Sequence, residues 1–172
     1  MLDTPNYTPE QLSGLRRFFH AMNHVMVFML RLGLGRMCEW WPEGFGRIMM
    51  IEHLGRRSGK RYLTPVNYAR VDDDVYCLAG FGPRTDWYRN IMSEPRVRLW
   101  LPRGQRAARA SDATDSPQRV SLMRQVIIGS GFAGPLMGVD QRKLSDEQLD
   151  QLTRDYRLVH FELEDGHAVP GR

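Results

Sequence analysis

Apolar positions in the middle of the chain come in short runs, separated by turn signals of Gly, Pro and Asp. Runs of this length that alternate or cluster apolar side chains are typical of β-strands. The expected strands are 47–54, 62–71, 75–80, 96–102, 105–111 and 157–165. Pro65 interrupts the second strand and predicts a sheet edge or a bulge there. About six strands with three or four helices predict a mainly β (α+β) fold, an antiparallel sheet or small barrel that carries helices.

Helix signals mark the two ends of the chain and one segment between the strands. The expected helices are 8–33, 85–94, 115–127 and 145–156. Thr85 or Asp86 is the expected cap of the second helix. Ser145 followed by Gln148 has the spacing of a capping box, which marks the start of the last helix. There are no regular βαβ units and no GxGxxG, which excludes a Rossmann fold.

The first expected helix carries the apolar stretch VMVFML, which Arg31 closes. This stretch is far shorter than the roughly 20 residues that a membrane-spanning helix needs. We expect the helix to pack on the domain or to form a dimer. The alternative is peripheral contact with a membrane, with Trp40 and Trp41 as interfacial anchors.

The composition is that of an ordinary globular protein, with 42% hydrophobic and 26% charged residues among 172. Cys38 and Cys77 are too few for a disulfide framework, and the polar first fifteen residues do not resemble a secretory signal. We expect a reduced cytoplasmic protein, with the inner face of the cell membrane as a peripheral location if the first helix binds lipid. A single domain, 1–172, is expected, divided into an N-terminal helix (1–40), a barrel core (47–111) and C-terminal helices with a last strand (112–172).

The net charge of +4 is concentrated in the middle of the chain. Residues 47–109 hold 13 Lys and Arg against 6 Asp and Glu, which gives +7 there. Such a concentration suggests an anionic partner. Nucleic acid is not the expected partner, because the cations cluster on a turn and no basic helix or helix-turn-helix pattern is present.

The cations are densest in GRRSGKR, residues 55–61, between two expected strands. A glycine-rich turn that exposes consecutive backbone N–H groups forms a concavity that binds anions, and Gly55 and Gly59 supply the unusual dihedrals. The side chains expected to hold a phosphate or several carboxylates are Arg56, Arg57, Ser58, Lys60 and Arg61. The alternative is a solvated hairpin tip whose charges only aid solubility. The GKS/T order of a Walker A loop is missing.

A second cluster, DWYRN at 86–90, has the chemistry of a slot for a flat ring. Trp87 offers an aromatic face and Asn90 an amide, which suit a heteroaromatic ring. Three residues just after the basic loop are expected to meet the polar edge of that ring with their backbone groups: Pro65, Val66 and Asn67. An anion cradle joined to a ring slot describes a nucleotide or flavin site.

These two clusters together resemble the deazaflavin-dependent nitroreductase family over about residues 47–110. Gly55 and Pro65 have the spacing of the loop in that family. The second element, W-Y-x-N-x-x-x-x-P, is matched by Trp87, Tyr88, Asn90 and Pro95. The resemblance implies a split β-barrel that binds coenzyme F420, a deazaflavin with a phosphate and a polyglutamate tail. Some similar proteins bind flavin, haem-type tetrapyrroles or lipids instead.

The resemblance also implies roles for single residues. The phosphate would meet the turn at Arg56, Arg57, Ser58 and Gly59, and Lys60 and Arg61 would meet the phosphate or the tail. The ring would lie against the backbone of Pro65, Val66 and Asn67, with Trp87 and Asn90 beside it. The chain departs from the family where Arg61 holds a position that is usually proline and Tyr62 one that is usually basic. The loop before the tryptophan is shortened to AGFGPRTD.

The implied activity is transfer of a hydride from reduced F420 to a small-molecule redox substrate: a quinone, a nitro compound or an activated alkene. The candidate proton donors are Tyr88, Tyr68 and Tyr156. The alternative is a non-catalytic barrel that binds flavin, haem or another tetrapyrrole, or fatty acid, with FMN or haem in place of F420. A homodimer is expected by analogy alone.

Three histidines are weaker candidates. His20 and His24 lie four residues apart but lack a third ligand, so we expect no metal site. His53, beside the basic loop, is expected to be a satisfied core residue. The alternatives for His53 are contact with a cofactor and ligation of haem.

Overall fold

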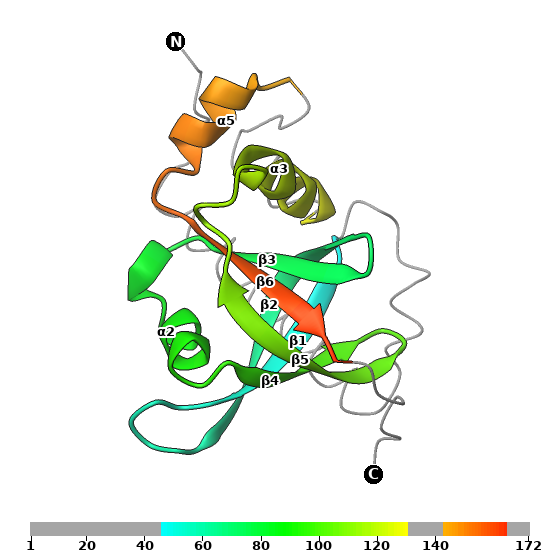
Figure 1. Ribbon diagram of the computed structural model, residues 1–172, viewed down its shortest axis with the longest axis vertical. Helices are drawn as coiled ribbons and strands as arrows, with labels where there is room; N and C mark the ends of the chain where they lie inside the picture. The colour runs from blue at the N-terminus through cyan, green and yellow to red at the C-terminus, as the bar shows by residue number, and fades with distance from the viewer. Residues whose placement is uncertain (1–45, 131–142, 165–172) are drawn as a thin grey trace, which may run out of the picture.

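Six antiparallel strands close into a barrel in the computed structural model, which describes residues 46–130 and 143–164 (Figure 1). The strands are β1 Ile48–Leu54, β2 Arg61–Val71, β3 Asp74–Ala79, β4 Arg96–Leu101, β5 Gly104–Asp112 and β6 Arg157–Leu163. Their order around the barrel is β1-β2-β3-β6-β5-β4, and β4 pairs back with β1. All six expected strands are present, and the predicted fold class is confirmed.

The described helices cover two regions of the barrel. They are η3 Gly82–Arg84, α2 Asp86–Ser93, α3 Arg119–Gly129 and α5 Asp146–Leu152. The capping box is confirmed, because Ser145 and Gln148 exchange both of its hydrogen bonds at the start of α5. Thr85 is the cap residue of α2 by position, although its side chain makes no capping bond. None of the described helices is long and apolar enough to cross a membrane.

Two hydrophobic clusters hold these elements together. The barrel interior is filled from all six strands and from α2, with Ile51, Leu99 and Phe161 fully buried. A smaller cluster lies where α3 covers β2, β3 and β6 on the outside of the barrel, and it includes Met123 and Leu158. Alternation along each strand separates the two, because successive side chains point to opposite faces. Helices α2 and α3 therefore bury different surfaces of the same sheet.

Pro65 lies at a sheet edge, as the sequence predicts. Residues 61–67 of β2 pair with β1 on one side, whereas β3 pairs only with residues 68–71. The other side of β2 at Pro65 therefore has no strand partner within the described residues, and the missing N–H of proline breaks no ladder there.

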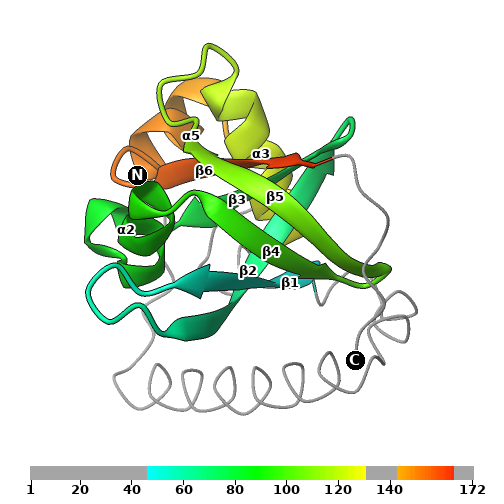
Figure 2. The same ribbon diagram turned by 60° about the horizontal axis from the view of Figure 1, so that its bottom comes forward.

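Helix α2 and the β1–β2 loop lie at the same end of the barrel (Figure 2). Tyr88 and Ile91, three residues apart, are buried in the barrel cluster. Asp86 and Asn90, four residues apart, contact the loop instead. Residues at these spacings share a helix face, so α2 presents one face to the core and another to the loop.

Several predictions fall outside the described residues. These are the first helix with Arg31, Trp40 and Trp41, the histidine pair at 20 and 24, and Cys38. The division of the chain into a single domain with three parts stays a prediction.

Candidate functional site

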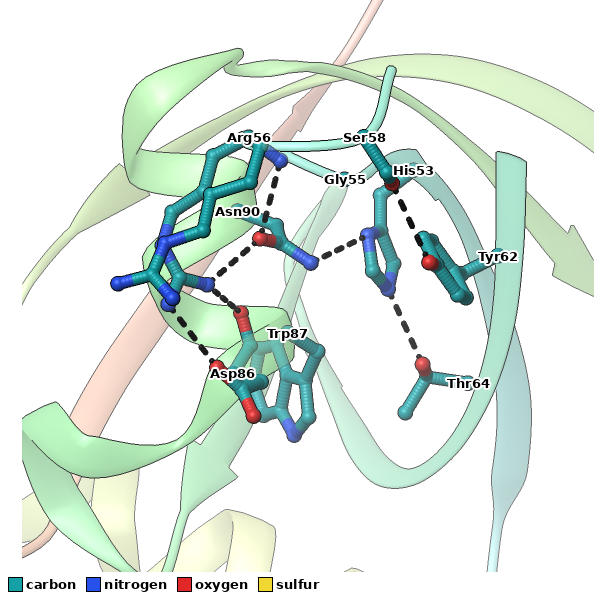
Figure 3. A pocket seen from close by; sticks show the side chains of 10 residues that line it. His53, Gly55, Arg56, Ser58, Tyr62, Thr64, Asp86, Trp87 and Asn90 are labelled. Carbon is teal, nitrogen blue, oxygen red and sulfur yellow. Dashed lines mark hydrogen bonds and ion pairs between the residues drawn. The ribbon is translucent and has the colours of Figure 1, made fainter. Parts of the chain in front are cut away.

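Arg56 ties the basic loop to α2. Its backbone N–H donates to Asn90 Oδ1 at 3.2 Å, and Nη1 donates to the same oxygen at 2.8 Å. Nη2 forms an ion pair with Asp86 Oδ1 at 3.0 Å (Figure 3). The guanidinium group of Arg56 is thus engaged by protein groups, and its side chain is only 19% exposed. Arg56 is therefore placed as a clamp that fixes the loop against the helix.

Most of the loop's N–H groups are also engaged within the protein. Gly55 N–H donates to the Lys60 carbonyl and Gly59 N–H to the Gly55 carbonyl, each at 2.8 Å. Lys60 N–H donates to Ser58 Oγ at 3.3 Å. Within the described residues, only the N–H groups of Arg57 and Ser58 have no partner in the loop. The predicted row of open N–H groups is therefore reduced to the tip of the turn.

The two glycines serve different purposes. Gly59 has a φ of +63°, a conformation that other L-residues rarely adopt. Gly55 is buried, and a Cβ there would lie 2.6 Å from both Ser58 Oγ and a ring carbon of Tyr62. Gly55 thus allows the Tyr62 ring to close over the base of the loop, where its hydroxyl lies 3.2 Å from Ser58 Oγ.

A pocket of about 480 Å³ opens between the loop, the start of β2 and α2. Figure 3 shows the side chains around it. Its lining residues are His53, Gly55, Arg56, Arg57, Ser58, Tyr62, Thr64, Asp86, Trp87 and Asn90. The two clusters that the sequence singles out, GRRSGKR and DWYRN, therefore meet in one cavity. This volume lies within the range of small-molecule sites, about 300–1,000 Å³.

The four cations of the loop have different surroundings. Arg57 lines the pocket, and its side chain has no hydrogen-bond or ion-pair partner among the described residues. Arg61 is 74% exposed and pairs with Glu52 at 2.9 Å, away from the pocket. Lys60 is exposed and does not line the pocket either. Arg57 is thus the best placed of the four to meet an anion inside the pocket.

The wall of the pocket opposite α2 is polar and comes from β1 and β2. His53 is directly opposite Tyr62 in the strand register, and their rings stack with centroids 5.9 Å apart. His53 Nε2 lies 3.1 Å from Thr64 Oγ1. Burial lowers the pKa of His53 below its usual range, although a hydrogen bond with the Leu54 carbonyl opposes this. His53 is therefore the satisfied buried histidine that the sequence predicts, and it also lines the pocket.

The three candidate proton donors lie away from the pocket. Tyr88 is buried and donates its hydroxyl hydrogen to Asp112 Oδ2 at 2.5 Å. Burial and this hydrogen bond raise the pKa of Tyr88 to about 12. Tyr68 lies in the barrel cluster and Tyr156 against the outer one. None of the three lines the pocket, whereas Tyr62 does.

The three residues expected to meet a ring through their backbone also fall outside the lining. Val66 lies in the barrel cluster, and Asn67 donates its side-chain amide hydrogen to the Ser130 carbonyl at 3.3 Å. Pro65 directly precedes them on β2. Their expected role stays a prediction.

Sequence reasoning missed Thr64 and Tyr62 as lining residues. The signal that could have found them is strand register, because a strand that exits the loop with alternate residues inward brings positions 62 and 64 to the side of His53. The register depends on the length of the loop, which the sequence did not fix.

The fold and the site together are a closed antiparallel barrel whose clamped, arginine-bearing loop borders a pocket of small-molecule size. The family described as F420H(2)-dependent quinone reductase matches residues 25–142, and the chain belongs to it. The resemblance that the sequence suggests is therefore confirmed. The family description names an oxidoreductase and its reductant, in agreement with the predicted enzyme class and with F420 as the predicted cofactor.

One curated relative, from Mycobacterium tuberculosis, carries the provisional name F420H(2)-dependent quinone reductase. It is 30% identical over 77 residues, which cover 43% of this chain and 64% of the relative. The chain thus matches less than two thirds of that relative's length.

Two solved structures are similar to the chain at low sequence identity. A protein from Bacteroides thetaiotaomicron, provisionally assigned to 5-nitroimidazole antibiotic resistance, has a TM-score of 0.50 at 12% identity, covering 70% of this chain and 74% of that chain. An F420-H2 dependent reductase has a TM-score of 0.48 at 16% identity, covering 67% of this chain and 94% of the other. At 12% identity, the similarity to the Bacteroides thetaiotaomicron protein bears on the fold alone.

Proposed function

We propose that the protein is an oxidoreductase that uses reduced F420 to reduce a quinone, with nitro compounds and activated alkenes as further acceptors. The observation that carries the proposal is the pocket, which joins Arg57, an arginine without a partner among the described residues, to Trp87 on α2. Membership of the F420H(2)-dependent quinone reductase family supports the cofactor and the acceptor class.

The residues around the pocket fit the two ends of such a cofactor. The Arg57 side chain and the N–H groups of Arg57 and Ser58, which have no partner within residues 46–130 and 143–164, suit a phosphate group. Trp87 lines the pocket while part of it packs against the barrel cluster, so it offers a fixed aromatic face. When bound, F420 supplies the hydride chemistry, and the protein binds and orients it.

The chain's own groups also suit a polar acceptor. Ser58 and Tyr62 bring two hydroxyl groups to the pocket. A quinone or nitro oxygen that gains charge during reduction is stabilised by fixed hydrogen-bond donors of this kind. Since the tyrosines at 68, 88 and 156 lie elsewhere, Tyr62 replaces them as the tyrosine best placed to donate a proton.

Ligand titration tests the cofactor. Purified protein is titrated with F420, FMN and haemin, and we expect F420 to bind most tightly. Stopped-flow mixing of the F420H2 complex with a quinone should then give oxidation that depends on quinone concentration. Tight binding without such oxidation would favour a carrier protein, and preference for FMN or haemin would reject the cofactor assignment.

The structure supplies an argument against haem ligation by His53. Both ring nitrogens already have partners, Thr64 at Nε2 and Asn90 or Leu54 at Nδ1. Binding of iron at either ring nitrogen would break one of these contacts, and His53 is only 4% exposed. The haem alternative therefore gains no support from this residue.

Dimerisation, peripheral membrane contact and a cytoplasmic location remain part of the proposal. Light scattering of the purified protein measures the first. Flotation with vesicles that contain anionic lipid measures the second, and cell fractionation the third.

A further inference from the structure

The inner face of the barrel changes from apolar to polar toward the β1–β2 loop. On β1 and β2 the inward residues Met49, Ile51 and Val66 belong to the hydrophobic cluster, but the next inward positions are His53 and Thr64. Buried polar groups keep their place only with hydrogen-bond partners. A chain of such partners runs from Arg56 to Thr64, and each link constrains the hydrogens of the next (Figure 3).

Arg56 fixes the orientation of the Asn90 amide. Its backbone N–H and its guanidinium group are both donors, at 3.2 and 2.8 Å from the same atom. A group that faces two donors must be an acceptor, so this atom is Oδ1. The amide nitrogen Nδ2 is then turned to His53, where it lies 3.5 Å from Nδ1.

Asn90 in turn selects a tautomer of His53. An amide nitrogen only donates, so Nδ1 of the imidazole accepts and the single ring hydrogen sits on Nε2. Burial lowers the pKa of His53, so the neutral ring with one hydrogen is the form that matters. The competing arrangement has Nδ1–H donating to the Leu54 carbonyl oxygen, which is also 3.5 Å away, but it would turn the Nδ1 hydrogen against a hydrogen of the Asn90 amide.

The tautomer sets the direction of the Thr64 hydroxyl. With its hydrogen on Nε2, His53 donates to Thr64 Oγ1 at 3.1 Å. The hydroxyl hydrogen of Thr64 must then point to another acceptor. Within the described residues Thr64 Oγ1 has no other partner, and the residue lines the pocket.

We propose that Thr64 is a ligand-binding residue whose hydroxyl donates a hydrogen bond into the pocket. Arg56, Asn90 and His53 are positioning residues that set this polarity. The ligand group that fits is an acceptor on the edge of a flat ring, either a carbonyl oxygen or an unprotonated ring nitrogen. This assignment rests on the proposed function, and it adds a contact for the ring to the contact that Arg57 offers to the anionic end.

The tautomer is tested without any ligand. In protein labelled with ¹⁵N at histidine, two-bond ¹H–¹⁵N correlations distinguish Nε2–H from Nδ1–H, and the variant His53→Gln assigns the signal. We expect Nε2–H near neutral pH. A His53 ring that carries its hydrogen on Nδ1 would overturn the proposal.

The contact is tested by titration with F420. Replacing a hydroxyl donor weakens a ligand by roughly tenfold when the acceptor loses its partner. We expect Thr64→Val to bind F420 about tenfold more weakly and Thr64→Ser, which keeps the hydroxyl, to stay within about twofold of the original protein. If the valine variant does not fold, Thr64→Ala takes its place.

Thr85→Val is the matched control. Thr85 lies at the start of α2 beside the pocket, but it does not line the pocket and its hydroxyl makes no capping bond. The same chemical change there should leave F420 affinity unchanged. An equal loss in the Thr64 and Thr85 variants would mean a general disturbance of this end of the barrel and would reject the hydrogen bond.

The outcomes separate this inference from the proposed function. If the unaltered protein binds F420 but Thr64→Val binds it equally well, the role of Thr64 is wrong and the function stands. If F420 does not bind at all, the proposed function is wrong. The same variants are then titrated with FMN, whose ring also carries carbonyl groups, and the same differences are expected.

Discussion

Two turns of opposite charge flank strand β2, and only the basic one lines the pocket. The loop before β2 carries Arg56, Arg57 and Lys60, whereas the turn after it carries Asp72 and Asp73. The acidic turn is exposed, and none of its residues lines the pocket. The basic loop is held by α2 and encloses a cavity.

The difference lies in what packs against each turn. Asp72 takes a φ of +54°, which Asp tolerates better than most residues. The basic loop gains its shape from Asp86 and Asn90 on α2, which hold Arg56. A dense group of charges therefore becomes a binding site only where a second element immobilises part of it and leaves another part unpaired.

Arg57→Ala should have the largest effect of these variants on F420 affinity. It removes the unpaired cation, and we expect F420 affinity to fall tenfold or more, since a desolvated charge-assisted hydrogen bond is worth about 1.5–3 kcal/mol. The melting temperature should not change, because the side chain has no partner among the described residues. Isothermal titration and a thermal melt measure both.

Arg61→Ala is the matched control for that variant. Arg61 belongs to the same charged segment but pairs with Glu52 outside the pocket. We expect a change in F420 affinity of less than about twofold, because exposed ion pairs contribute little. Equal losses in both variants would show that general positive charge, and no particular contact, attracts the ligand.

Arg56→Ala should instead act mainly on stability. It breaks the contacts with Asn90 and Asp86, and we expect the free energy of unfolding to fall by about 1–3 kcal/mol. F420 affinity should fall as well, because the loop loses its anchor to α2. Arg56→Lys keeps the charge but not the planar fork, so it should recover little of the stability. Urea unfolding measures the change, and an unchanged midpoint would show that Arg56 is no clamp.

The strands and helices of the fold follow from local patterns in the sequence. Strands 47–54 and 157–165 were predictable because their runs of apolar side chains end at clear turn or loop signals, and α5 because Ser145 and Gln148 form a capping box. The meeting of GRRSGKR with DWYRN was predictable from the family resemblance. Closure of the barrel was implied by that resemblance and by no local pattern, because the pairing of β1 with β4 joins residues about fifty positions apart.

The different roles of the two adjacent arginines in the basic loop were not predictable. Arg56 and Arg57 are adjacent and chemically identical, and only the position of α2 decides which guanidinium group is engaged. The same limit applies to Tyr88, which suggests a proton donor by its place beside Trp87 but turns its hydroxyl to Asp112. A helix rotates successive side chains by about 100°, so neighbours in sequence face different partners.

Acidification should weaken the loop end of the barrel through His53. Burial lowers the pKa of His53 in the folded state, so the stability that the neutral ring contributes is present above about pH 6.5 and is lost as the pH falls through the folded-state pKa. Protonation also places a second cation behind Asn90, close to Arg56. Urea unfolding between about pH 5 and 7.5 should show a steeper loss of stability on acidification than in His53→Gln. Parallel curves for the two proteins would contradict this.

Asp72→Asn should have the smallest effect and completes the comparison of the two turns. The change removes a charge from the acidic turn but keeps a residue that tolerates positive φ, so the free energy of unfolding should change by less than about 0.5 kcal/mol. F420 affinity should stay within about twofold, because Asp72 lies at the opposite end of β2 from the pocket and its charge is screened beyond roughly 10 Å at 0.1 M salt. A clear gain in affinity at that salt concentration would mean that the field of the whole molecule guides the anion. In that case the loop would be one contributor among several, and the local explanation of the site would have to be abandoned.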